Sequence, residues 1–310
     1  MRLVVALGGN ALLRRGEAMT SAHQLESVET ACTALVPLAA GHELVITHGN
    51  GPQVGLLALQ AAAYDEVSGY PFDILDAQTV GMIGYLLERE LRNRLPPERD
   101  VTTLVTMVRV APDDPAFEDP TKFVGPVYAK DEAAVLAKAQ GWTVKQDGAA
   151  WRRVVPSPLP LGIVELGPVG RLLDSGSVVI CAGGGGVPVI LDPSSGRLVG
   201  VEAVVDKDRT SAVLAIALGA DRLVIVTDVD AVYEGWGGEH PRALAIVHPD
   251  QLEAMTFPDG SMGPKVAAAC LFARSGARDA VIGSLSNLGG LLAGDAGTVV
   301  TTSQDGTTYR

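Results

Sequence analysis

The 310-residue chain has only three cysteines, and its basic side chains are outnumbered by acidic ones, 24 to 36. Cys32, Cys181 and Cys270 are far apart, odd in number and set in apolar segments. We therefore expect buried thiols of a reducing compartment rather than disulfides or a metal cluster. The net charge of −12 opposes non-specific binding to nucleic acid or to an anionic membrane. Any anion-binding site must therefore be positive only locally.

The sequence also has no apolar run long enough to span a membrane. Its longest apolar stretch, residues 178–191, is interrupted by four glycines. The first residues form a short apolar run that soon meets glycine, asparagine and arginine, which is too short for a signal peptide. Five scattered histidines show no metal-ligand spacing. We expect a cytoplasmic protein with neither a nucleic-acid nor a membrane partner.

Several motifs of familiar enzyme classes are missing. The chain has no Gly-x4-Gly-Lys-Ser/Thr loop, no Gly-x-Gly-x-x-Gly opening its first helix, and no His-Arg-Asp kinase loop. It also has no Gly-x-Ser-x-Gly elbow, no His-Glu-x-x-His and no paired cysteine ligands, which argues against a serine hydrolase and a zinc enzyme. An enzyme of this sequence that acts on phosphates must use another scaffold.

Three β-rich runs do end in glycines and small polar residues. These ends are Gly8-Gly9-Asn10, His48-Gly49-Asn50-Gly51 and Cys181-Ala182-Gly183-Gly184-Gly185-Gly186. Adjacent glycines let backbone N–H groups approach an anion, although such a motif alone is more often a tight turn between strand and helix. Open α/β sheets bind ligands just outside the carboxyl ends of their strands. The recurrence of the motif therefore predicts one shared anion site.

Strands and helices alternate along most of the chain. We expect a first helix capped by Ser21, a longer helix that Asp73 caps and that runs to Leu91, and one strand from Val101 to Val110. Such alternation is typical of a parallel sheet covered by helices on both faces. The sequence predicts an α/β fold, a three-layer αβα sandwich around a mainly parallel open sheet.

The alternation stops between about residues 111 and 160, where prolines, charges and short strands replace long helices. We expect a small protruding subdomain there. The pattern then resumes, with a strand over residues 222–227 and a helix from about 263 to 274. We expect two lobes that share one continuous sheet: an N-terminal lobe of residues 1–195, which includes the subdomain, and a C-terminal lobe of residues 196–310.

Two lysines stand at predicted helix starts. Lys207 lies between two aspartates, and Lys265 follows Gly263-Pro264. A solvated surface lysine is the ordinary alternative for each. Phosphoryl transfer, however, needs point charges that stabilise negative charge on three equatorial oxygens. Asp208 can hold these lysines or cap its helix, and the two roles are compatible.

Six motifs spread over nearly the whole chain together resemble those of the carbamate kinases, which are members of the amino acid kinase family. Several of them are specific to carbamate kinases. The motifs are Leu7-Gly8-Gly9-Asn10-Ala11-Leu12, His48-Gly49-Asn50-Gly51-Pro52-Gln53-Val54-Gly55, Trp151-Arg152-Arg153-Val154-Val155-Pro156-Ser157-Pro158, Gly183-Gly184-Gly185-Gly186, residues 200–208 and Gly260-Ser261-Met262-Gly263-Pro264-Lys265.

The resemblance implies a phosphoryl-acceptor site in the N-terminal lobe and a nucleotide site in the C-terminal lobe. It implies that Lys122, in the subdomain, closes over the transferring phosphoryl group, while Lys207 and Lys265 lie at its other faces. Asp208 would organise the lysines. The implied cradle for carbamate and the phosphoryl group consists of Gly8, Gly9, Asn10, Gly49, Asn50 and Gly51.

The implied reaction is reversible phosphoryl transfer between carbamoyl phosphate and ADP, which gives ATP and carbamate. Because carbamate is already an anionic oxygen nucleophile, no general base is required. The resemblance also implies Mg2+ held mainly by the nucleotide phosphates, with no metal ligand from the protein, and a homodimer. The implied nucleotide pocket consists of Thr227, Asp228, Val229, Tyr233, Met262, Pro264 and Lys265.

The chain departs from the family pattern at two positions in the subdomain. Phe123 replaces the proline that usually follows the subdomain lysine, and Ala149 replaces an arginine before Trp151. The missing guanidinium is either a phosphate contact or a structural ion pair. We favour the structural role because all three lysines remain. Subdomain closure and turnover are the properties that these departures affect.

Two other functions remain open. One is a kinase for a different small acid, such as N-acetylglutamate, which the motifs at residues 48–55 and 151–158 argue against. The other is a sensor of nucleotide or carbamoyl phosphate that binds without turnover. Retention of Lys122, Lys207 and Lys265 disfavours the sensor, because binding alone needs fewer charges than transfer.

Overall fold

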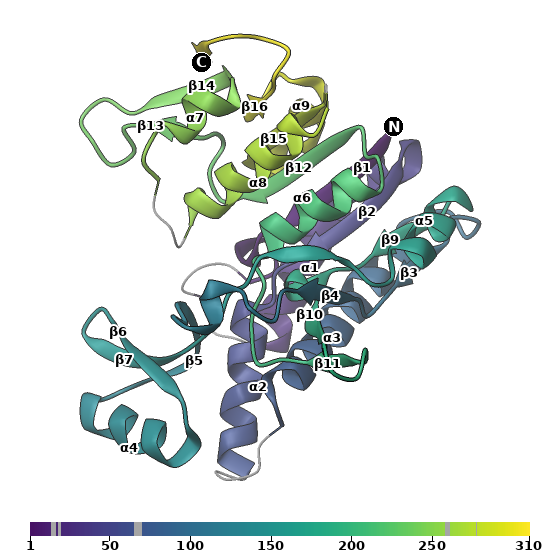
Figure 1. Cartoon of the computed structure of the whole chain (residues 1–310). Helices are drawn as coiled ribbons and strands as arrows, with labels where there is room; N and C mark the ends of the chain where they lie inside the picture. The colour runs from purple at the N-terminus through teal and green to yellow at the C-terminus, as the bar shows by residue number, and fades with distance from the viewer. Residues whose placement is uncertain (14–16, 18–19, 65–69, 258–260, 277) are drawn as a thin grey trace.

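The computed structural model describes residues 1–13, 17, 20–64, 70–257, 261–276 and 278–310, without the side chains of Asn10, Ala62 and Pro126. A ten-stranded sheet has the order β13-β14-β16-β15-β12-β1-β2-β9-β3, and β17 pairs with β14 (Figure 1). These strands are β13 (Tyr233–Glu234), β14 (Arg242–Val247), β16 (Thr298–Val300), β15 (Asp279–Ser284), β12 (Arg222–Thr227), β1 (Arg2–Leu7), β2 (Glu43–His48), β9 (Val178–Ile180), β3 (Val101–Thr103) and β17 (Thr307–Tyr309).

The strands from β15 through β3 are all parallel to their neighbours, whereas β16 runs antiparallel to β15. The central strand β1 is buried on both faces. Val4 and Ala6 belong to one hydrophobic cluster, and Leu3, Val5 and Leu7 belong to the other. Burial on both faces explains why the strand is a continuous apolar run instead of alternating with polar residues. The predicted mainly parallel sheet is confirmed.

Helices cover both faces of this sheet, which makes three layers. Helices α1 (Ser21–Gly41), α3 (Phe72–Arg92) and α9 (Leu288–Ala293) contribute to one cluster. Helices α5 (Leu166–Asp174), α6 (Lys207–Ala217) and α8 (Met262–Arg274) contribute to the other. The remaining helices are α2 (Gly51–Tyr64), α4 (Lys130–Gln140) and α7 (Pro249–Glu253), with 3-10 turns η1 (Gly9–Ala11), η2 (Pro115–Phe117), η3 (Gly183–Gly185) and η4 (Leu285–Asn287).

The single strand expected from Val101 to Val110 is wrong. The chain leaves the large sheet after β3 and enters a second sheet as β4 (Met107–Val110), in the order β11-β10-β4-β8. Thr106 lies at the break. Its hydroxyl accepts a bond from the Ala182 amide at 2.7 Å, and its carbonyl accepts one from Val187 at 2.9 Å. The other strands of this sheet are β8 (Pro160–Ile163), β10 (Val187–Leu191) and β11 (Leu198–Gly200).

A third sheet, of order β5-β7-β6, forms a separate unit with α4 and projects beyond the other layers in Figure 1. Its strands are β5 (Lys122–Tyr128), β6 (Thr143–Asp147) and β7 (Ala150–Val155). Arg153 connects this unit to the rest of the chain through an ion pair with Glu202. The same guanidinium lies 4.7 Å from the ring centre of Trp142 and 5.7 Å from that of Phe72.

The helix caps differ from those expected. Thr20, not Ser21, caps α1, because its side chain accepts a bond from the His23 amide. Pro71 precedes α3, so Asp73 lies within the first turn, where a carboxylate is stabilised by the helix dipole. The three cysteines are buried, as predicted. Among the described residues, no helix is long and apolar enough to cross a membrane.

Candidate active site

The first two glycine motifs lie against each other because β1 and β2 are parallel neighbours and end at the same edge of the sheet. A Cβ added to Gly49 would stand 3.3 Å from the Gly9 amide nitrogen and 3.8 Å from Cδ of Lys207. The absence of side chains therefore lets two backbone segments and a lysine stem meet. Gly8 is tighter still, since a Cβ there would stand 2.9 Å from the Val226 carbonyl oxygen.

The third glycine motif follows β9, the neighbour of β2, and closes the same edge. Gly184, Gly185 and Gly186 all have positive φ angles, of 67°, 98° and 86°. A Cβ on Gly185 would stand 2.3 Å from the Val205 carbonyl oxygen, just before α6. Only glycine combines this backbone conformation with such close approach. The three motifs therefore lie in one region of the fold, and the shared anion site stays a prediction.

Two lysines converge on one carboxylate at the start of α6. Lys207 Nζ donates to Oδ1 of Asp208, and Lys265 Nζ lies 3.2 Å from Oδ2 of the same residue. Asp208 is 3% exposed. Its side chain does not cap α6. Asp206 does so, accepting bonds from the amides of residues 208 and 209 at 3.0 and 3.1 Å.

The electrostatics of this cluster keep Asp208 ionised. Burial alone raises the pKa of its carboxyl. Lys207 and, after it, Lys265 lower this pKa by more than burial raises it, so the net pKa is below the ordinary value. The lysine side chains are 11% and 17% exposed, which leaves part of each available to a ligand. The two lysines and Asp208 together carry a net positive charge, although the protein as a whole is acidic. An anion site on this protein requires such a local positive charge.

Lys122 approaches the same helix start from the subdomain. Its Nζ lies 3.6 Å from Oδ2 of Asp206, and its side chain is 42% exposed. All three lysines expected at the site thus pair with the aspartates 206 and 208.

The two residues that depart from the family pattern lie elsewhere in the projecting unit. Phe123 lies beneath the Arg152 guanidinium at 5.8 Å, and Ala149 is exposed in the turn between β6 and β7.

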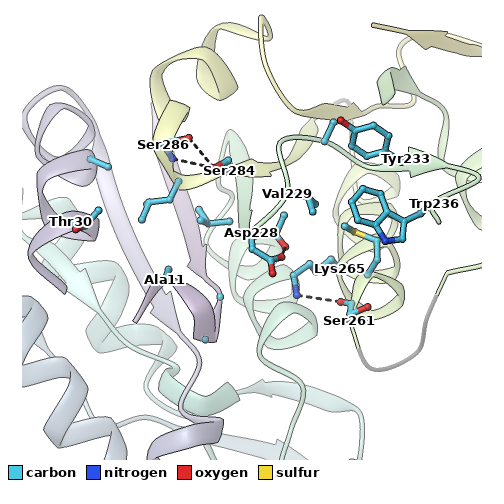
Figure 2. Close-up of a pocket in the computed structure, with 18 of the residues that line it drawn as sticks. Ala11, Thr30, Asp228, Val229, Tyr233, Trp236, Ser261, Lys265, Ser284 and Ser286 are labelled. Carbon is cyan, nitrogen blue, oxygen red and sulfur yellow. Dashed lines mark hydrogen bonds between the residues drawn. The ribbon is translucent and has the colours of Figure 1, made fainter. Parts of the chain in front are cut away.

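A cavity of about 1500 Å³ extends from the first glycine motif along the carboxyl ends of β12 and β15. Figure 2 shows Lys265 and Asp228 on its wall, with Tyr233 and Trp236 farther along. Six of the seven residues expected in the nucleotide pocket line this cavity, and Pro264 does not. The six are Thr227, Asp228, Val229, Tyr233, Met262 and Lys265.

Sequence reasoning missed several lining residues. Trp236 is 64% exposed, and its ring centre lies 5.2 Å from that of Tyr233. Ser284, Leu285 and Ser286 follow the carboxyl end of β15. The rule that located the glycine motifs, applied to that strand end as well, would have found the serines. Trp236 has no such signal, because its position depends on the course of the loop after Tyr233.

His48 and Asn50 occupy the interior beside the cradle. Burial lowers the pKa of His48 to about 4, and its Nδ1 lies 3.1 Å from the Gly49 carbonyl oxygen. Asn50 donates from Nδ2 to Asp76 and, at 2.7 Å, to the Thr79 hydroxyl, both on α3. The side chain of Asn10 lies outside the described residues, although its backbone is part of η1.

Burial raises the pKa of Asp76 to about 7, and nearby Asp73 adds to the increase although the Asn50 donor opposes it. In the native state Asp76 therefore binds a proton over a range, from about pH 4 to 7, in which the unfolded chain has lost it. The free energy of unfolding must fall as pH rises through this range.

Asp76→Asn removes this titration without changing the size of the side chain. From pH 5 to pH 8, we expect the free energy of unfolding of the variant, relative to the original protein, to rise by about 2 kcal/mol. Urea unfolding at the two pH values measures the difference. Asp113→Asn, at an exposed turn position, is the control for the substitution itself. If the free energies of unfolding of Asp76→Asn and the original protein differ by the same amount at both pH values, the raised pKa assigned to Asp76 is wrong.

The model of the amino acid kinase family matches residues 1–284 of this chain. A carbamate kinase of Rhizobium meliloti is 53% identical over 304 residues, which cover 98% of this chain and 94% of that protein. One from Pyrococcus horikoshii is 45% identical over 312 residues, covering 97% and 99%.

Solved structures give the same result. The structure of carbamate kinase from Giardia lamblia bound to AMP-PNP superposes with a TM-score of 0.90 at 37% identity, covering 97% of this chain and 98% of that one. The similarity therefore extends over the glycine motifs, the projecting unit with α4 and the cavity alike.

Proposed function

Because the chain belongs to the amino acid kinase family, and within it to the carbamate kinases, we propose that it transfers a phosphoryl group reversibly between carbamoyl phosphate and ADP. The observation that carries this proposal is the pair of lysines on buried Asp208, beside the glycine motifs and next to the cavity. A kinase for N-acetylglutamate is disfavoured, since three relatives that are 45%, 52% and 53% identical over nearly the whole chain are carbamate kinases.

We assign the cradle residues Gly8, Gly9, Gly49 and Gly51, with Asn10 and Asn50, to carbamate and the transferring group. Backbone amides and the lysine ammonium groups would stabilise charge that develops on the phosphoryl oxygens during in-line transfer. No general base is needed, because the carbamate oxygen is already anionic. His48 is consistent with this mechanism, since its lowered pKa keeps it neutral at pH 7.

The nucleotide is assigned to the cavity, with Thr227, Asp228, Val229, Tyr233 and Met262 on its wall. Pro264 lies in the first turn of α8 and would act by placing Lys265. Residues 1–195 would thus serve the acceptor and residues 196–310 the nucleotide. Among the described residues, no group of three His, Cys, Asp or Glu side chains could hold a metal. Mg2+ would bind mainly through the nucleotide phosphates and neutralise their charge.

One assay tests the proposal. Purified protein is mixed with MgADP and carbamoyl phosphate, and ATP is measured. We expect ATP formation well above the uncatalysed background. A protein that binds nucleotide normally but forms no ATP would be a sensor instead, and the proposal would be wrong.

Lys122→Ala should lower kcat by about 100-fold, because one of the charges next to the transferring group is lost. The fold should be unaffected, since this side chain is 42% exposed. Lys145→Ala is the matched control, as Lys145 lies in the same small sheet and pairs only with exposed Asp119 in the described structure. If both variants keep the original kcat, Lys122 has no role in transfer.

We also propose a homodimer in the cytoplasm. The outer face of α3 supports self-association, since Ile74 is 41% exposed and Tyr85 is 59% exposed. The two residues lie on the same side of the helix, where a second copy would cover them. Sedimentation velocity measures the mass directly, and a species of 32.1 kDa at micromolar concentration would contradict the dimer.

A further inference from the structure

The orientation of the Asn50 amide is fixed by its hydrogen-bonding partners. The Thr79 hydroxyl donates its hydrogen to the Asp76 backbone carbonyl at 2.7 Å. Its oxygen can then only accept, so the Asn50 group that faces it must be the NH2. The second amide hydrogen points to the Asp76 carboxyl, whose Oδ1 accepts it.

Both hydrogens of the Asn50 amide are therefore used within the protein, and only its acceptor remains. No bond from a described residue to Oδ1 is present, and this atom is not among the polar atoms sealed from solvent without a partner. All three residues that form these bonds are in the interior: Asn50 is 4% exposed, Asp76 2% and Thr79 0%. The network is thus rigid enough to hold one orientation.

The Asn50 amide lies next to the cradle. Gly49, the preceding residue, contacts Gly9 and the stem of Lys207. On the other side, the amide packs on Gly184, where an added Cβ would stand 2.8 Å from Oδ1. The amide is thus held next to the second and third glycine motifs, beside a backbone segment and a lysine that offer donors to an anion.

This arrangement suits the one part of carbamate that donates hydrogen bonds. A carbamoyl group differs from an acetyl group by an NH2 in place of a CH3 of similar size. An acceptor-only site bonds the NH2, whereas the CH3 leaves a desolvated oxygen without a partner, which is costly.

We propose that Asn50 Oδ1 accepts a hydrogen bond from the amino group of carbamate and carbamoyl phosphate and so determines specificity against carboxylates and acyl phosphates of the same shape. Asp76 and Thr79 are positioning residues that prevent the amide from turning its NH2 toward the substrate. The inference rests on the proposed function and adds to it the means of selecting the substrate.

Two phosphonates test this selection without catalysis. Phosphonoacetamide carries the NH2, and acetonylphosphonate carries a CH3 at the same place. Calorimetry on the unmodified protein should show phosphonoacetamide binding tighter by about 10-fold or more. Equal dissociation constants would overturn the inference, and this measurement requires no variant.

A pair of variants tests the positioning role. Thr79→Val keeps the shape of the side chain but removes the acceptor that orients the amide, so the ratio of the two dissociation constants should fall toward one. Thr79→Ser keeps a hydroxyl and should keep the ratio. A purely structural role would weaken both phosphonates equally in Thr79→Val, and that result would overturn the positioning role.

The ATP assay separates the two proposals. If the protein forms ATP from carbamoyl phosphate but binds both phosphonates equally, carbamate kinase activity stands and the specificity role of Asn50 falls. If no ATP forms although nucleotide binds, the proposed function fails. A preference for phosphonoacetamide would still support the acceptor at Asn50 in that case.

Discussion

Lys207→Ala is expected to lower kcat by about 1000-fold while leaving the protein folded. Lys207 is the lysine whose stem lies beside Gly49 and whose ammonium group pairs with Asp208. A preorganised charge in a water-poor site stabilises a transition state far more than the same charge in water does. Because the charge on the equatorial oxygens is greatest in the transition state, kcat should fall more than KM rises.

Lys265→Ala should behave similarly, because Lys265 meets the other oxygen of the same carboxylate. Initial rates of ATP formation, with thermal unfolding measured in parallel, distinguish loss of catalysis from loss of structure. Lys138→Ala, in the last turn of α4, is the control and should retain the original kcat. Unchanged rates in Lys207→Ala would show that the role is misassigned.

Asp208→Ala should damage both stability and catalysis. Removing the carboxylate leaves two ammonium groups facing each other in a nearly buried site, and breaking such a pair costs about 3 kcal/mol. The stabilisation is fully present at neutral pH, because the folded-state pKa of Asp208 is below its ordinary value, and it is lost only as pH falls through that pKa. With the lysines repelled from their positions, kcat should also fall by about 100-fold.

Asp279→Ala is the control for this experiment. Asp279 forms an ion pair with Arg222 at 3.2 Å, at the start of β15, which is the opposite edge of the sheet from the site. Urea unfolding should show a small loss of stability for this variant, and kcat should not change. If Asp208→Ala also kept its kcat, the carboxylate would serve stability alone.

The sheet and the gathering of the glycine motifs could be predicted because both follow from local patterns. Buried strands are continuous apolar runs, and the carboxyl ends of parallel neighbours meet at one edge. The break at Thr106 could not be predicted, because the run from Val101 to Val110 is uniformly suited to a strand. What divides it is a pair of bonds to residues 182 and 187, which are distant in sequence.

The candidate site shows the same division. Lys207 and Lys265 are recognisable from their neighbours in the sequence, whereas Lys122 is identified only through the family resemblance. Which aspartate caps α6 depends on where the first turn begins, and that is a matter of one or two residues. Asp76 and Thr79 gave no signal as partners of Asn50, since 26 and 29 residues separate them from it. Their bonds exist only because α3 packs beside the loop after β2.

Glu202 links the projecting unit to the start of α3. One carboxylate oxygen accepts the Phe72 amide at 3.1 Å, at the start of α3, and the other bonds Arg153 of β7. The two oxygens thus serve different parts of the molecule. A movement of the unit that carried Lys122 nearer to or farther from Asp206 would therefore act on the Arg153 bond, which joins β7 to Glu202.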